Sequence, residues 1–205
     1  MITFVLIAVT VLVSWQAFEK RRLYERLVLW PPGVERFRQY DRLLTHGFVH
    51  ADWMHLLFNM ITLYFFGRAV EGVFAQLAGP GMFALFYLSA IVVAILPSYL
   101  RHRKDGRYFS MGASGAVSAV LFAFVLVDPW NWIIVFVVPV PAVVYAIAYV
   151  GYSYWMDKRG GDNINHSAHL SGAIYGLLFM LLMKPALFWF FLERLASPRG
   201  PGFLG

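Results

Sequence analysis

Ser114 is the residue whose type and surroundings best fit a nucleophile. It lies in the segment Gly112-Ala113-Ser114-Gly115, where a long apolar stretch of the chain begins. A serine hydroxyl is a weak nucleophile at neutral pH and needs a neighbouring general base. Free backbone N–H groups at a helix start favour negative charge, so the N–H of Ser114 could also stabilise an acyl-transfer oxyanion. Close packing of small residues between helices is the alternative explanation for this segment.

His169 is the candidate base. It begins a second apolar stretch and is followed by Gly172 and Gly176. Small residues four positions apart let two helices approach closely, and Gly115 lies on a similarly smooth segment. Packing these two segments together would bring the imidazole within about 2.6–3.2 Å of the Ser114 hydroxyl. A histidine that bonds a loop carbonyl at the start of a helix is the alternative.

His55 and Asn59 are the candidate oxyanion-hole side chains. They stand four residues apart, so in a helix they share one face and offer two hydrogen-bond donors there. Donors placed before the reaction stabilise a tetrahedral oxyanion, and the loss of one costs about 10²–10³ in rate. His50, five residues earlier, could brace His55 or the connection that precedes it. Two polar residues that satisfy each other inside a bundle would show the same spacing.

Metal catalysis is not expected. Five of the six histidines fall into two clusters along the chain, made of His46, His50, His55, His166 and His169. The sequence has no His-Glu-x-x-His motif, which supplies two ligands and a glutamate base in metalloproteases. It also has no cysteine, which excludes a thiolate nucleophile, a disulfide and a cysteine-bound metal. We therefore expect neither a metal site nor another cofactor.

The composition indicates a protein that crosses a membrane several times. Of the 205 residues, 60% are hydrophobic and only 14% are charged, against roughly 25% charged residues in soluble domains. The formal net charge is +6. Because the basic residues flank apolar stretches, the expected partners are anionic membrane lipids, and no nucleic-acid binding is expected.

The chain has six apolar segments of about the length that a spanning helix needs, roughly 20 residues. These predicted spans are residues 2–18, 55–74, 81–99, 113–128, 132–155 and 167–183. Pro139 and Pro141 are interpreted as kinks within the fifth span. The connection 19–54 is expected to lie partly embedded in the membrane surface, and an aromatic tail at 187–196 is expected at the interface. The predicted fold is an all-α polytopic membrane protein with six transmembrane helices in one domain, residues 1–205.

Taken together, these segments resemble the motifs of the rhomboid family of intramembrane serine proteases. Residues 112–115 match its Gly-x-Ser-Gly motif, and residues 168–176 match its Ala-His-x-x-Gly-x-x-x-Gly motif. Residues 50–59 match its His-x-x-x-x-His-x-x-x-Asn segment, and residues 67–71 resemble its Gly-x-x-x-Glu segment. The order of the motifs and the six spans also agree with the bacterial-type core of that family.

The resemblance implies a serine endopeptidase that cleaves transmembrane segments of single-pass membrane proteins, with a Ser–His dyad and no cofactor. Ser114 would be the nucleophile and His169 the base, while the Ser114 N–H, His55 and Asn59 would form the oxyanion hole. The supporting residues would be His50, Gly112, Gly115, Gly172 and Gly176. Two alternatives remain: a rhomboid-like protein that binds transmembrane segments without cutting them, and a small transporter or channel, which calls for broken helices or charges at mid-span.

Two positions depart from the pattern of the family. Ser118 stands where many bacterial relatives have a tyrosine packed on the histidine, which leaves the support of the His169 ring open. Asp41-Arg42 stands where relatives often have an aromatic residue before the arginine. We expect Arg42 to pin the first connection by bonding backbone carbonyls.

Two arguments about orientation disagree. Most lysines and arginines lie in the connections on the Ser114 side of the spans, and the positive-inside rule would place that side in the cytosol. Bacterial and secretory-pathway rhomboids usually open to the outside or the lumen. We follow the family pattern and expect an integral protein of the bacterial inner membrane with its site facing outward. The substrate and the oligomeric state do not follow from the sequence.

Overall fold

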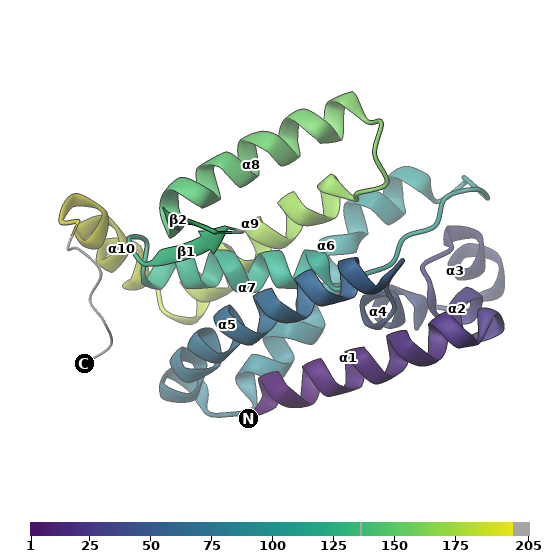
Figure 1. Ribbon diagram of the computed structural model, residues 1–205, viewed down its shortest axis with the longest axis horizontal. Helices are drawn as coiled ribbons and strands as arrows, with labels where there is room; N and C mark the ends of the chain where they lie inside the picture. Colours follow the sequence, from purple (N-terminus) through teal and green to yellow (C-terminus); the bar gives the residue numbers. More distant parts are fainter. Residues whose placement is uncertain (136, 199–205) are drawn as a thin grey trace.

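A computed structural model describes residues 1–135 and 137–198. Position 136, in the predicted fifth span, and residues 199–205, in the predicted single domain, lie outside the described residues. The described part is a bundle of long helices that run side by side (Figure 1). These helices are α1 (Ile2–Glu19), α5 (Trp53–Ala78), α6 (Met82–His102), α7 (Ser114–Val127), α8 (Ala142–Arg159) and α9 (His166–Met183), followed by the shorter α10 (Leu187–Ala196).

Helix α7 forms the centre of the bundle, with α5, α6 and α9 packed against it. Eleven of its 14 residues are buried, and its sequence is apolar around the whole circumference, as expected of a helix enclosed by others. Small residues such as Ala116, Ala119 and Ala123 allow the neighbouring helices to come close. Ser114, the first residue of α7, is therefore held by the most enclosed helix of the fold.

Four helices in the described part of the chain are long and apolar enough to cross a membrane, namely α1, α5, α6 and α9. Helix α7 is strongly apolar, but it has only 14 residues. Helix α8 has 18 residues, and its last turn carries Asp157, Lys158 and Arg159. Each of the six predicted spans thus contains a helix. In the described residues, however, only four of these helices are long and apolar enough to count as membrane spans.

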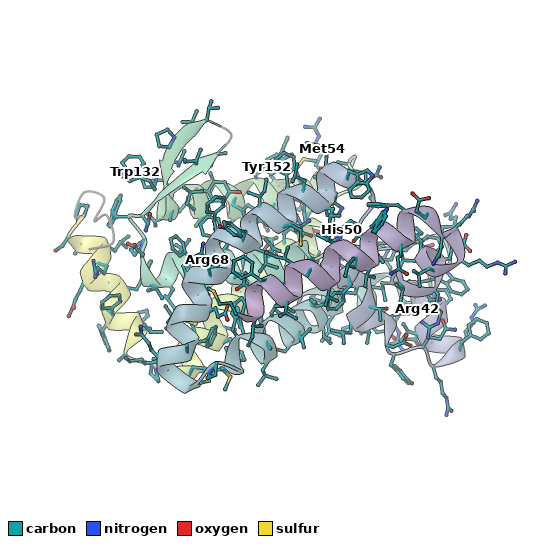
Figure 2. The ribbon with its side chains drawn as sticks, turned by 60° about the horizontal axis from the view of Figure 1, so that its bottom comes forward. Arg42, His50, Met54, Arg68, Trp132 and Tyr152 are labelled. Carbon is teal, nitrogen blue, oxygen red and sulfur yellow. The ribbon has the colours of Figure 1, made fainter. Side chains whose placement is uncertain are left out.

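The prediction of the fifth span was wrong at its beginning. Residues Trp132–Val135 (β1) and Val138–Pro141 (β2) form an antiparallel hairpin, with Trp132 opposite Pro141, and Figure 2 labels Trp132 on this ribbon. Isoleucine and valine favour strands. Each proline removes a helical N–H donor and disfavours helical backbone in the residue before it. Two prolines two positions apart therefore exclude a helix here instead of kinking one, and α8 begins only at Ala142.

The first connection folds into short helical pieces beside the end of α1 (Figure 1). They are α2 (Arg21–Leu27), α3 (Pro31–Phe37), α4 (Arg42–Thr45) and the 3₁₀ turn η1 (His46–Phe48). Leu29 pairs with Ser110 in an isolated β-bridge, which ties this connection to the strand-like segment that leads into α7. The embedding of this connection in the membrane surface stays a prediction.

Arg42 holds the short helices together, as the sequence predicts. Its guanidinium is buried, and its Nη1 donates to the backbone oxygens of Val28 at 2.6 Å and Glu25 at 2.8 Å. Its Nε donates to Oε1 of Gln39 at 2.6 Å. Figure 2 shows Arg42 among these helices at one end of the bundle. One planar, always-charged group thus satisfies carbonyls that the breaks between helices leave open.

Glu71 fixes the crossing of α1 and α5. Its carboxylate accepts hydrogen bonds from the Ile2 N–H at 2.6 Å, the Thr3 N–H at 3.0 Å and the Thr3 hydroxyl at 2.6 Å. Free N–H groups at a helix start favour a negative charge, so Glu71 acts as a cap supplied by a neighbouring helix. Gly67, one turn earlier, leaves room for Thr3, since a Cβ there would lie 3.1 Å from Thr3 Cγ2.

The first prediction concerns this cap. We expect Glu71→Gln to lower the free energy of unfolding by about 1.5–3 kcal/mol, because hydrogen bonds to a charged acceptor are replaced by weaker ones. Thermal unfolding of the purified protein in detergent measures the change. Glu193→Gln on α10, which changes an exposed glutamate, is the control. Equal unfolding midpoints for the two variants would contradict the cap.

Candidate active site

A cavity of about 950 Å³ is lined by residues of α5, α6, α7, α8 and α9 and of the segments before α7 and α9. Its lining includes all four side chains that the sequence singles out as chemistry-bearing, which are Ser114, His169, His55 and Asn59. The remainder of the lining is mixed, with aromatic side chains from α8 and polar side chains from the segments before α7 and α9. The structure therefore places the candidate nucleophile, base and oxyanion donors around one cavity. In the described residues no hydrogen bond joins the Ser114 hydroxyl to the His169 ring, so their predicted hydrogen-bond contact stays a prediction.

The backbones of α7 and α9 touch at the glycines. A Cβ on Gly172 would overlap the carbonyl oxygen of Gly115, and a Cβ on Gly176 would overlap the carbonyl oxygen of Ala119. Glycine removes this obstacle, so the two helices approach more closely than side chains normally allow. Ser114 lies one residue before the first contact and His169 three residues before it. The contact thus brings the starts of both helices together.

Gly112 meets two demands at once. Its φ is +112°, a region that side chains rarely adopt. A Cβ there would also lie 2.6 Å from Cε1 of the His55 ring. The glycine therefore lets the chain turn sharply into α7 while the imidazole of His55 lies against the backbone two residues before Ser114.

The start of α5 is capped by Asp52, whose Oδ1 accepts a hydrogen bond from the His55 N–H at 2.8 Å. Asn59 is buried, and its side-chain Nδ2 donates to the backbone oxygen of His55 at 2.9 Å. This bond uses one of the two amide hydrogens and leaves the second for another acceptor. His55 and Asn59 therefore stay on the cavity face of α5 without bonding each other through their side chains.

His50 braces the backbone beside Ser114. Its ring is fully buried, with Nδ1 2.9 Å from the Ser14 hydroxyl and Nε2 accepting from the Ala113 N–H at 3.3 Å. Ser14 donates its own proton to the backbone oxygen of Phe48 at 2.9 Å, so Nδ1 of His50 must carry the hydrogen. The neutral Nδ1–H tautomer thus links α1 to the residue that precedes Ser114. Figure 2 shows His50 in the interior of the bundle.

The second prediction follows from the neutral state of His50. Burial, aided by the neighbouring His55, lowers the pKa of His50 to about 3. The unfolded chain takes up this proton near pH 6.5 and the folded chain does not, so stability falls as the pH drops from about 6.5 toward 3. We expect the unfolding midpoint to fall between pH 7.5 and 5, and to fall less in His50→Gln. His102→Gln, at a partly exposed histidine, is the control. An unchanged pH dependence in His50→Gln would contradict this reading.

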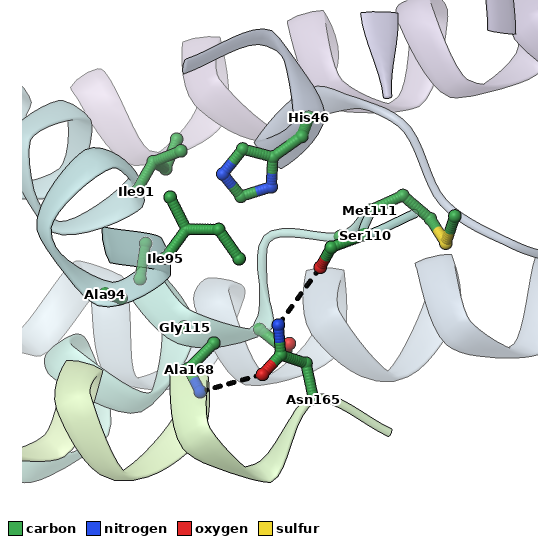
Figure 3. A pocket seen from close by; sticks show the side chains of 12 residues that line it. His46, Ile91, Ala94, Ile95, Ser110, Met111, Gly115, Asn165 and Ala168 are labelled. Atoms are coloured by element: carbon green, nitrogen blue, oxygen red, sulfur yellow. Dashed lines mark hydrogen bonds between the residues drawn. The ribbon is translucent and has the colours of Figure 1, made fainter. Parts of the chain in front are cut away.

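A small cavity of about 10 Å³ lies behind Ser114, between α6, α7 and the start of α9 (Figure 3). Asn165 lines it, with Nδ2 donating to Ser110 Oγ at 3.1 Å and Oδ1 accepting from the Ala168 N–H at 3.0 Å. This space is about the size of one water molecule. The bonds of Asn165 cap α9 and fix its first turn, where His169 lies.

Sequence reasoning missed two residues that surround His169. Tyr149 of α8 stacks on the imidazole, with ring centroids 5.8 Å apart and planes at 23°. His166 meets the same ring edge-on at 5.8 Å, and its Nε2 lies 3.0 Å from Oδ2 of Asp162. The hydrogen bond from His166 lowers the pKa of Asp162. The sequence signal for Tyr149 is indirect: Ser118 stands in place of the expected tyrosine, which leaves the support of the His169 ring open.

In the described residues, no group of three or more histidine, aspartate or glutamate side chains is arranged to hold a metal ion. The expectation that the protein uses no metal and no other cofactor stays a prediction.

Comparisons with known proteins place this chain in a family. A sequence profile of the Rhomboid domain matches residues 38–186. RHOMBOID-like protein 12, mitochondrial, from Arabidopsis thaliana is 31% identical over 177 residues, which cover 80% of this chain and 52% of that protein. Rhomboid protease GlpG from Haemophilus influenzae is 28% identical over 87% of this chain and 88% of its own length. Presenilin-associated rhomboid-like protein, mitochondrial, from Rattus norvegicus is 30% identical over 67% of this chain and 37% of its own length.

The chain spans about half the length of the Arabidopsis relative. The relatives are named as mitochondrial and chloroplastic proteins as well as bacterial ones, so they do not support the predicted bacterial inner membrane over an organelle membrane. With four helices long and apolar enough to span a bilayer, this is a membrane protein. The domain match covers most of the chain, including every chemistry-bearing residue that lines the large cavity, and on that ground the chain belongs to the rhomboid family.

Proposed function

We propose that this protein is an intramembrane serine endopeptidase that cleaves transmembrane segments of single-pass membrane proteins. The observation that carries the proposal is the shared cavity of Ser114 and His169, at the starts of two helices whose backbones touch through Gly115 and Gly172. A hydroxyl and an imidazole that share a cavity in a family that includes serine proteases are best explained as nucleophile and base.

The chemistry runs through the dyad. His169 takes the hydroxyl proton of Ser114 as the oxygen attacks the scissile carbonyl carbon, and it then gives that proton to the leaving amine. The tetrahedral oxyanion lies at the start of α7, where the Ser114 N–H, the His55 ring and the free amide hydrogen of Asn59 are the donors. Water then attacks the acyl-enzyme with His169 as base, and His169 passes that proton to the Ser114 oxygen as the bond between this oxygen and the acyl carbon breaks, which releases the carboxylic acid and restores the hydroxyl. His50 and Gly112 support this arrangement by fixing the backbone before Ser114.

The surroundings of the site suit a substrate that arrives through the membrane. We infer that α7 and α8 also cross the bilayer, which completes six spans in one domain, and that lipids surround them. Both α5 and α8 contribute to the lining of the large cavity. Helix α8 buries only Ala142, Ala146 and Ser153 of its 18 residues, so it is the long helix most easily displaced by a substrate segment. The polar rim of the cavity supplies water, and we place this rim on the outer side of the membrane.

The test is cleavage of a single-pass test substrate by the purified protein in detergent, together with labelling by a fluorophosphonate probe. An active dyad cleaves the substrate and forms a covalent adduct at Ser114, which peptide mass spectrometry locates. A protein that binds the substrate segment but neither cleaves it nor reacts with the probe would be a binding protein, the alternative function, and would overturn the proposal.

A further inference from the structure

The imidazole of His169 has an unusual set of neighbours for a general base. Within residues 1–135 and 137–198, no carboxylate forms a hydrogen bond or ion pair with it. Its ring contacts are aromatic, with Tyr149 on its face and His166 at its edge. A base must hold its ring at a fixed angle toward the nucleophile, and in Ser-His-Asp enzymes a carboxylate does this. In this protein the flat contact with Tyr149 is the structural feature available for that task.

The ring of Tyr149 is itself held at its far end. Its hydroxyl lies 2.5 Å from Oγ of Ser118, and that oxygen lies 2.8 Å from the backbone oxygen of Ser114, to which it donates. Because the Ser118 proton goes to this carbonyl, the Tyr149 hydroxyl must donate to Ser118. A continuous chain of contacts therefore runs from the His169 ring through Tyr149 and Ser118 back to the nucleophile.

The position of this tyrosine on α8 is also informative. Stacking on His169 ties α8 to the start of α9, which lies beside it in Figure 1. Tyr149 is one of the lining residues of the large cavity, together with Tyr145 one turn earlier. The support of the base thus comes from the helix that borders the cavity and buries the fewest residues, and the angle of the ring depends on where α8 lies.

We propose that Tyr149 is the positioning residue of His169: its ring holds the imidazole toward Ser114, and its hydroxyl is anchored through Ser118 to the nucleophile's own backbone. The proposal rests on the proposed dyad. Tyr149 replaces, from a different helix, the tyrosine whose place is taken by Ser118. In this proposal Tyr149 acts through His169, which makes it a positioning residue.

Two replacements separate the ring from the hydroxyl. Tyr149→Phe keeps the ring and loses one hydrogen bond, and we expect kcat to fall about 3- to 10-fold. Tyr149→Leu keeps an apolar side chain but loses both the flat ring and the hydroxyl, and we expect kcat to fall about 100-fold, as a misplaced catalytic group does. KM should stay within about twofold in both, because the proposed role concerns the angle of the base and not the binding of the substrate. Tyr154→Ala, an exposed tyrosine on the same helix with Lys158 over its ring, is the matched control and should leave both constants unchanged.

A second readout does not depend on activity. In NMR spectra of protein that is isotopically labelled at the histidine rings, the His169 resonances are assigned by their loss in His169→Gln. The chemical shifts of these resonances should change in Tyr149→Leu, change little in Tyr149→Phe, and stay unchanged in Tyr154→Ala. Unmoved His169 signals in Tyr149→Leu would overturn the proposal even if the protein proves to have no protease activity. Equal kcat for the Leu and Phe variants, or a loss confined to KM, would overturn it in an active protein.

Discussion

Replacing Ser114 or His169 by alanine should lower kcat for substrate cleavage by about 10⁴-fold or more. Without the hydroxyl there is no nucleophile, and without the imidazole nothing removes its proton. The two act as one unit, so the double variant should be no slower than the slower single variant. Cleavage of a single-pass test substrate by purified protein, followed on gels over long incubations, measures the loss.

The control for this prediction is Ser153→Ala. Ser153 is a buried serine of α8 that does not line the large cavity, and its replacement should leave cleavage near the wild-type rate. Thermal unfolding should show that Ser114→Ala and His169→Ala fold like the wild type. Cleavage near the wild-type rate in either alanine variant would refute the dyad.

Gly172→Ala should be the most damaging of the conservative changes. One added methyl group would overlap the backbone oxygen of Gly115, and backbone cannot swing away as a side chain can. Overpacking of this kind costs about 1–3 kcal/mol, occasionally more. The helices must also separate near Ser114 and His169, and a shift of about 1 Å there costs roughly 100-fold in rate. Unfolding midpoints and cleavage rates in detergent measure both effects.

Two other glycines sharpen this test. Gly176→Ala meets the backbone of Ala119 one turn farther from the site, so it should cost similar stability with a smaller loss of rate. Gly151→Ala on α8 meets nothing within 4 Å and should stabilise its helix by about 0.5–1 kcal/mol. If Gly172→Ala behaves like Gly151→Ala, the close contact of α7 and α9 is not required.

The motifs found in the sequence carry much of the site because each lies at a helix start. Ser114 begins α7, His169 lies in the first turn of α9, and Asp52 caps α5 just before His55. Glycine spacing predicted that α7 and α9 would pack closely, and a local pattern suffices for this because backbone contact needs only small residues.

Other parts depend on contacts that no local pattern contains. Tyr149 is one of several tyrosines on α8, and only the packing of α8 selects the one that meets His169. The bond from Ala113 to His50 joins residues 63 positions apart. A count of apolar residues predicts a span before α8, but Pro139 and Pro141 interrupt a helix there, and the isoleucines and valines beside them form the hairpin.

In the proposed protease, the shortness of α7 sets the depth in the membrane at which a substrate is cut. Fourteen residues make a helix about 21 Å long, against about 30 Å of hydrocarbon in a bilayer. If the far end of α7 reaches one boundary of the hydrocarbon, its first residue stops about 9 Å short of the other. Inserting one turn into α7 would raise Ser114 by about 5.4 Å, and the bond broken would then move along the substrate helix toward the aqueous side. The number of residues between Ser114 and Asp128 thus determines how far Ser114 lies below the boundary of the hydrocarbon layer.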